Sequence, residues 1–119
     1  MENIKINISK NQEKKLPSNI EAEQSLIGSI LVNNDIIDEI SNIVNSGKFF
    51  DPVHRKIYET IENLNNKGMI ANPITLKNYF ENDSGLSEVG GVDYLVKLTR
   101  FSSSIKQAID YAKIIHEMY

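Results

Sequence analysis

Two histidines, His54 and His116, are the side chains of this sequence that most readily suggest a chemical site. They stand far apart in the chain, and neither belongs to a zinc-binding run such as H-E-x-x-H. The chain has no cysteine, which excludes thiolate metal sites and cysteine nucleophiles. His54 follows Asp51 at the expected start of a helix, where bonding near the helix end explains it better than acid–base catalysis. We therefore predict no metal site and no catalytic residue, with a small hydrolase using His54 and Asp51 as an alternative.

The glycines of the segment SGLSEVGG (84–91) come nearest to a phosphate-binding loop, G-x-x-x-x-G-K-[ST]. Gly85 and Gly90 have the right spacing, but Gly91 and Val92 stand where the lysine and the hydroxyl residue should be. Glycines that tolerate positive φ explain the segment better as a loop between two helices. The sequence therefore predicts no ATPase activity and no bound cofactor.

Glu21 and Glu23 suggest a carboxylate pair, but residues two apart on a helix point in different directions. They cannot share a proton in acid–base catalysis. Glu21 instead has, with Ser18, the S-x-x-E spacing of a capping box. Glu23 is expected on a solvated or hydrogen-bonding face of the same helix.

The net charge of −3 is unevenly distributed along the chain. Residues 1–16 hold four lysines and two glutamates, so this polar segment carries +2 and is predicted to be a disordered basic tail. An alternative is a short strand, because Ile4, Ile6 and Ile8 alternate with polar residues. Residues 17–119 carry the other 9 basic and 14 acidic side chains, hence −5.

An acidic body of this kind repels phosphate, so direct DNA binding is not expected. A freestanding helix-turn-helix regulator is the alternative function, but no predicted helix has the row of Arg, Lys, Asn or Gln that a recognition helix needs. The chain also lacks an apolar run long enough for a membrane span or a signal peptide. We therefore expect a soluble, cytoplasmic protein.

Apolar residues at helical spacing predict an all-α domain over residues 17–119, a compact bundle of about six helices. The fourth helix is expected to bury Leu76, Tyr79 and Phe80. The last runs from about Ile105 to the final residue with no stop signal and is apolar on more than one side, as if cut short. The residues expected to cap successive helices are Ser18, Asp35, Asp51, Asn72 and the serines 102–104.

The sequence resembles the N-terminal domain of bacterial DnaB-type replicative DNA helicases. Five stretches match in order and spacing, and the resemblance covers about residues 16–119. Asn72, where the family often has an acidic residue, and Gln107, where it often has asparagine, are mild departures. The matching stretches are LPSNIEAEQSLIGSIL (16–31), FFDPVHRKIYETI (49–61), PITL (73–76), VGGVDYL (89–95) and YAKIIHE (111–117).

The resemblance implies the globular head of a helicase of chromosomal replication, whose last helix begins a hairpin leading to a RecA-like motor. ATP and Mg would bind that motor, which this chain does not contain. The implied partners are the other subunits of a homo-hexamer, a DnaG-type primase and a helicase loader, in the replisome at the nucleoid. Tyr111, Ile115, Met118 and Tyr119 are the candidates for surface facing the hairpin or a neighbouring subunit. The alternative is that Tyr111 and Ile115 complete the core of the head.

Overall fold

The computed structural model describes residues 19–118, with the side chain of Met118 left out. Ser18, Tyr119 and the predicted basic tail (1–16) lie outside the described residues. Within them the structure contains helices and no strand, which confirms the predicted all-α fold, and it has one α-helix more than the six expected. The α-helices are α1 (Ile20–Val32), α2 (Ile37–Ile43), α3 (Pro52–Asn66), α4 (Pro73–Phe80), α5 (Ser84–Val89), α6 (Val92–Thr99) and α7 (Ile105–Met118), with single 3-10 turns at Asn34–Ile36 and Ser46–Lys48.

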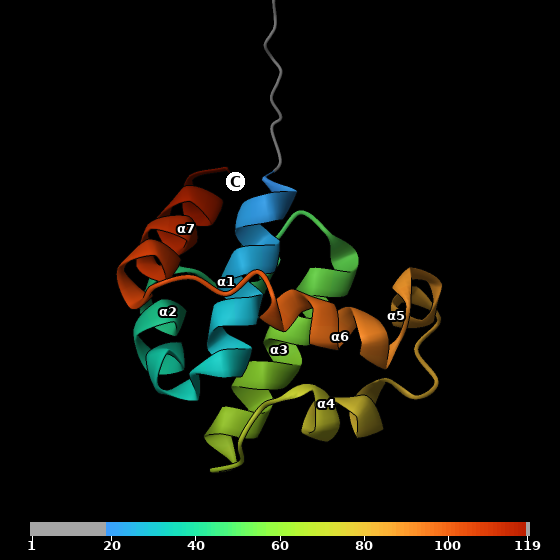
Figure 1. Ribbon diagram of the computed structural model, residues 1–119. Coiled ribbons are helices and arrows are strands. Elements are labelled where there is room, and N and C mark those ends of the chain that lie inside the picture. Colours follow the sequence, from blue (N-terminus) through green and yellow to red (C-terminus); the bar gives the residue numbers. More distant parts are fainter. Residues whose placement is uncertain (1–18, 119) are drawn as a thin grey trace, which may run out of the picture.

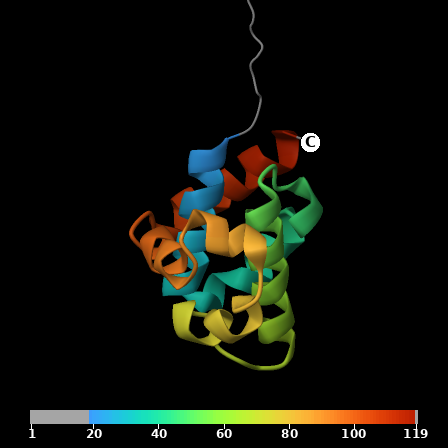
Figure 2. The same cartoon turned by 90° about the vertical axis from the view of Figure 1, so that its right-hand side faces the viewer.

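Helix α1 lies at the centre of the fold, with α7 on one side and with α3 and α6 crossing it (Figure 1). The view turned by 90° shows α4 at the end of the molecule opposite the first turn of α1 (Figure 2). Nine of the 13 residues of α1 are buried, including Glu23, Ser25 and Ser29. A helix covered on nearly all sides needs apolar or internally bonded residues all round, and this sequence provides both.

Close contact between α1 and α6 depends on Gly28. A Cβ atom built at this position would lie 1.9 Å from the Leu98 carbonyl oxygen. The loop after α6 is bonded to the same face of α1, since the Ser103 N–H donates to Ser29 Oγ at 2.9 Å. The fold therefore places backbone against backbone where the two helices cross.

The helix caps differ from the expectation at two positions. The N-cap of α1 is Asn19, whose side chain accepts from the Ala22 N–H at 3.0 Å. Asp35 does not cap the second helix, because Asn33 takes the N-cap of a 3-10 turn that contains Asp35. Asp51 and Asn72 occupy the N-caps of α3 and α4, each followed by a proline at the first helical position.

The segment SGLSEVGG, expected as a loop, contains α5. Asp83 caps this short helix by accepting from the Leu86 N–H at 3.0 Å, and Leu86 is buried against the core. Gly90 and Gly91 then turn the chain into α6 with φ of 122° and 63°. The prediction of a turn was thus correct for Gly90 and Gly91 and wrong for Gly85, which lies within α5.

Tyr79 was expected in the core and is 50% exposed. On the short helix α4 the buried face consists of Leu76 and Phe80, and Tyr79 lies at the edge of a hollow beside Lys67, the residue that follows α3. Tyr58 is the large aromatic side chain at the centre, where its hydroxyl donates to the Val44 carbonyl at 2.8 Å. Burial raises the pKa of Tyr58 above its ordinary value. Over residues 19–118, no helix has the length and hydropathy to cross a lipid bilayer.

Candidate functional site

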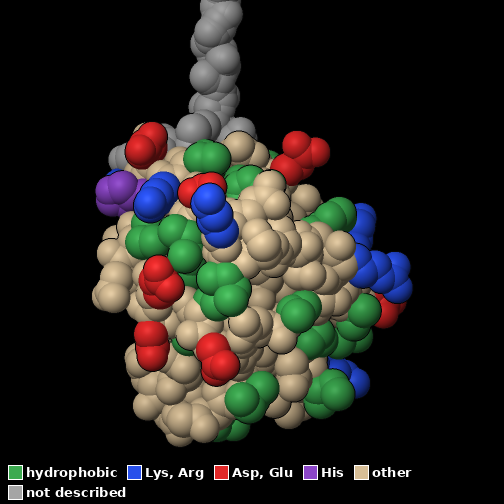
Figure 3. Space-filling view, turned by 60° about the vertical axis from the view of Figure 1, so that its left-hand side comes forward, with side chains coloured by type: hydrophobic (Ala, Val, Ile, Leu, Met, Phe, Trp, Pro, Cys, Tyr) green, Lys and Arg blue, Asp and Glu red, His purple; other side chains and the backbone are tan. Residues whose placement is uncertain are grey.

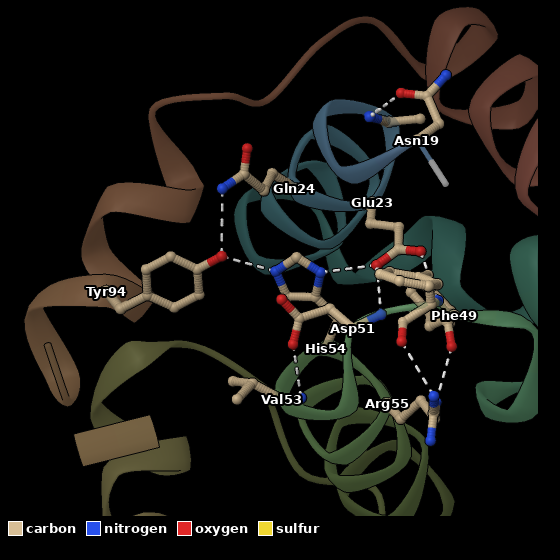
Figure 4. A network of polar contacts seen from close by, with 11 residues as sticks. Asn19, Glu23, Gln24, Phe49, Asp51, Val53, His54, Arg55 and Tyr94 are labelled. Atoms are coloured by element: carbon tan, nitrogen blue, oxygen red, sulfur yellow. Dashed lines mark hydrogen bonds and ion pairs between the residues drawn. The ribbon is translucent and has the colours of Figure 1, made fainter. Parts of the chain in front are cut away.

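Three polar side chains from three helices meet inside the molecule and form what we call the Glu23–His54–Tyr94 network (Figure 4). His54 Nδ1 lies 2.8 Å from Glu23 Oε1, and His54 Nε2 lies 2.6 Å from the Tyr94 hydroxyl. The His54 and Tyr94 rings are nearly parallel, with centroids 5.9 Å apart. His54 has no solvent exposure and Glu23 is 2% exposed, so the network is a buried junction of α1, α3 and α6.

The hydrogen bonds of Glu23 indicate which atoms donate and which accept in the network. Its carboxylate accepts the Phe50 N–H at 2.6 Å and the Asp51 N–H at 3.3 Å. In the tautomer with the proton on Nδ1, His54 donates to this carboxylate and its Nε2 accepts from the Tyr94 hydroxyl. The Gln24 amide donates to the Tyr94 oxygen at 3.2 Å and completes the chain of donors.

Tyr94 keeps its proton in this position. Burial raises the pKa of the Tyr94 phenol, the Gln24 hydrogen bond opposes that rise, and the nearby charges of Asp51 and Glu23 add to it. The hydroxyl can therefore serve as a donor to His54 at any pH near neutrality. Every polar atom of the His54 ring is satisfied, as a buried imidazole requires.

Asp51 does not act on His54. Its side chain accepts from the Val53 N–H at 2.8 Å as the cap of α3. Beside it, the Arg55 guanidinium donates to the carbonyls of Phe49 and Phe50 at 2.7 and 3.0 Å. With His54 sealed from solvent and Asp51 occupied by the helix end, the pair has no geometry for a hydrolase. The network instead fixes the turn that precedes α3 against α1 and α6.

Sequence reasoning placed His54 at the start of α3 but missed its partners. Glu23 was left on a solvated or hydrogen-bonding face, and the structure places it on a buried, hydrogen-bonding one. A carboxylate flanked by apolar positions on both sides of a helix turn was the available signal. Tyr94 carried no such signal, because its distance from His54 depends on how α6 crosses the bundle.

The predicted interface residues on α7 are separated by the fold. Ile115 is 1% exposed and belongs to the core, so it is not available as a free contact surface. Tyr111 is half-buried against the core, and its hydroxyl accepts from the Gln107 amide at 3.0 Å. Met118 and Tyr119 have no described side chain. The outer face of α7 instead exposes Ile105 and, at 37%, Ile114.

These features define the class of protein: a compact, all-helical domain built on a central buried helix, with a polar junction that serves structure. Residues 15–117 match the model of the family described as DnaB-like helicase N terminal domain. The chain belongs to this family, in agreement with the resemblance of its five sequence stretches.

Individual relatives agree with the family match. The chain is 42% identical over 118 residues to the replicative DNA helicase DnaB of Rickettsia felis, which covers 94% of this chain and 24% of the relative. It is 33% identical over 120 residues to the DnaB of Buchnera aphidicola, and this alignment covers 98% of this chain and 26% of the relative. The chain thus spans about a quarter of the length of the curated relatives that it matches.

A solved structure supports the fold independently. The crystal structure of the N-terminal domain of DnaB helicase from Mycobacterium tuberculosis superimposes with a TM-score of 0.78 at 29% identity. The match covers 87% of this chain and 75% of that structure. It therefore includes nearly all of the helices described above.

Proposed function

We propose that this chain is the N-terminal head of a replicative DNA helicase of chromosomal replication, and that it serves assembly and docking without catalysis of its own. The observation that carries the proposal is the family match over residues 15–117, combined with relatives that are replicative helicases four times as long. Under this proposal, ATP and Mg would bind a motor outside the matched quarter. The protein would work in the cytoplasm, in the replisome at the nucleoid.

The proposed partners are the other subunits of a homo-hexamer, whose heads form a collar, together with a DnaG-type primase and a helicase loader. The exposed apolar side chains of α7, Ile105 and Ile114, support a contact with further helical chain or with a neighbouring subunit. The net charge of −5 on residues 17–119 supports protein contacts over binding to the phosphate backbone.

Sedimentation equilibrium tests this proposal. The 119-residue chain is compared with a chain extended at its C-terminus by about 40 residues of the relatives' sequence, enough for two antiparallel helices. Each is measured with and without the C-terminal domain of a primase. We expect self-association and primase binding in the extended chain. If the extended chain stays monomeric and ignores primase, the assembly and docking role is wrong even though the family is not.

A further inference from the structure

The outer surface of α6 is bordered by two hollows that adjoin along the helix. The first, of about 190 Å³, lies where α4, α5 and α6 meet and is lined by Phe80, Leu86 and Val92, among others. The second, of about 360 Å³, is lined by Asp93, Val96, Lys97 and Arg100. Val92 and Val96 are four residues apart, so they are neighbours on one helical face and join the two hollows. We call this surface the α6 groove and define it by Phe80, Leu86, Val92, Val96, Lys97 and Arg100. Its charged lining also includes Lys77, Glu81 and Asp93, so cations outnumber carboxylates by three to two.

The α6 groove combines exposed apolar side chains with unpaired positive charge. Val96 is 41% exposed, and Phe101 just beyond the helix is exposed as well. Among the described residues neither Lys97 nor Arg100 forms an ion pair. From Tyr94 to Ile109 the sequence has no acidic residue at all. Figure 3 shows hydrophobic side chains interspersed with Lys, Arg and acidic side chains along the right-hand edge of the molecule.

The inner face of α6, opposite the groove, is packed against the core. Leu95 and Leu98 are fully buried on the inner face of α6, and Leu98 meets Gly28 at the helix crossing. Tyr94 is tied into the buried network, and Ser103 is bonded to α1. A surface that is already ordered loses little conformational entropy when a partner binds, which favours association.

We propose that the α6 groove docks an acidic, amphipathic helical segment of a partner protein. Apolar side chains at helical spacing would fill the two hollows, and carboxylates beside them would meet Lys97 and Arg100. The cationic end lies on a body of charge −5, so it stands out as the place where an acidic segment is attracted rather than repelled. This proposal depends on the proposed function in one respect: it assumes that the chain has a docking partner.

A nucleic acid fits this surface less well than a protein segment does. Its phosphates would meet the two cations, but Phe80, Leu86 and Val92 would gain nothing from a charged backbone. Single-stranded DNA is therefore an outcome of the test and not the proposed occupant.

The test uses the 119-residue chain and a synthetic helical peptide of about 18 residues, with leucines along one face and glutamates on both sides of them. A matched peptide has lysines in place of the glutamates, and a single-stranded oligo-dT of about 20 nucleotides is the third probe. Fluorescence anisotropy gives the affinity of each probe. We expect the acidic peptide to bind at least about tenfold more tightly than the other two.

Variants locate the binding surface. The Lys97→Glu, Arg100→Glu double variant should weaken binding of the acidic peptide by about tenfold or more, and Val96→Ser should weaken it severalfold. The matched controls, Lys67→Glu with Lys113→Glu, and Val32→Ser, change exposed residues outside the groove and should have an effect below about twofold. Circular dichroism melting verifies that each variant is folded.

Three results would overturn the proposal. The acidic peptide does not bind, or the two peptides bind equally well, or the control pair reduces binding as much as the Lys97 and Arg100 pair does. Tight binding of oligo-dT that Lys97→Glu abolishes would reassign the surface to nucleic acid. Nuclear magnetic resonance shifts confined to residues of α6 and its neighbours would support the groove. None of these outcomes bears on hexamer assembly, which the sedimentation experiment measures separately.

Discussion

Gly28 of α1 lies directly against the main chain of Leu98 in α6, with no room for even a methyl group between them. The atoms that a side chain would strike are the carbonyl oxygen and carbon of Leu98, which are held in the last turns of a helix. These main-chain atoms cannot move away by a change of rotamer, as a flexible side chain could. The position of α6, and with it Tyr94 and the α6 groove, therefore depends on a hydrogen atom at residue 28.

Gly28→Ala should be strongly destabilising, although alanine is the better helix former. We expect a loss of about 3 kcal/mol or more, because α6 must move away from α1. Urea denaturation followed by circular dichroism measures the change. Gly47→Ala is the control, since its Cβ would meet only the Asn45 side chain at 3.2 Å. Equal stability of the two variants would contradict the close crossing of α1 and α6.

The Glu23–His54–Tyr94 network should show energetic coupling between its members. Tyr94→Phe leaves His54 Nε2 buried without a donor and should cost about 1 to 3 kcal/mol. His54→Phe leaves Glu23 without its imidazole partner and should cost about 3 kcal/mol or more. In the double variant the costs should not add, with a coupling of about 1 kcal/mol or more.

Tyr79→Phe is the control for this cycle, because Tyr79 is exposed and forms no bond to the network. Its effect should stay within about 0.5 kcal/mol. Additive costs for Tyr94→Phe and His54→Phe would mean that the hydroxyl and the imidazole act independently, against the 2.6 Å contact described above.

Ile115→Asp should unfold the domain and not merely alter its association. Ile115 is 1% exposed in the core, where an unpaired carboxylate costs several kcal/mol, about the whole stability of a small domain. Ile114→Asp, on the more exposed side of the same helix, should lower the melting temperature far less than Ile115→Asp does. A folded Ile115→Asp variant with weakened self-association would instead restore this residue to an interface.

Glu62 should give the domain a pH-dependent stability. Burial between α2 and α3 raises the pKa of Glu62, the Ser41 hydrogen bond opposes the rise, and the charge of Glu59 adds to it. Because the folded state holds this proton more tightly than the unfolded state, stability falls as pH rises through the raised pKa. Above that range, the ionised carboxylate destabilises the fold.

Glu62→Gln should therefore stabilise the domain near pH 7, by less than about 1 kcal/mol because the group is partly solvated. The gain should disappear near about pH 3.5, where the native carboxyl is protonated as well. Thermal melting of both proteins at the two pH values tests this, with Glu88→Gln on the exposed side of α5 as the control. A gain that is the same at both pH values would exclude titration of Glu62 as its cause.

Local chemistry made most of the fold predictable. The caps at Asp51 and Asn72 followed by proline, and the isoleucines and leucines at helical spacing, located α3 and α4 from the sequence. The cap of α1 was misplaced because Ser18 and Asn19 are adjacent residues of equal capping ability. Helix α5 was missed because six residues give too little periodicity to detect.

What could not be predicted depends on contacts between distant parts of the chain. His54 and Tyr94 are 40 residues apart, and their hydrogen bond follows from how α6 crosses α1. The packing of α7 against α1 and α2 likewise buries Ile115 and leaves Ile114 outside, although the two residues are adjacent in the chain and equal in chemistry. A helical pattern shows that a face is apolar, but it does not show which of two apolar faces meets the core.

The central position of α1 also determines when the domain can fold during synthesis. Ser29 on this helix bonds to Ser103, 74 residues later, and α7 covers a further side. Helix α1 therefore leaves the ribosome long before the segments that bury it exist. Until those segments emerge, Leu26, Ile27 and Ile30 have no core in which to be buried, and transiently exposed apolar surface of this kind is prone to aggregation.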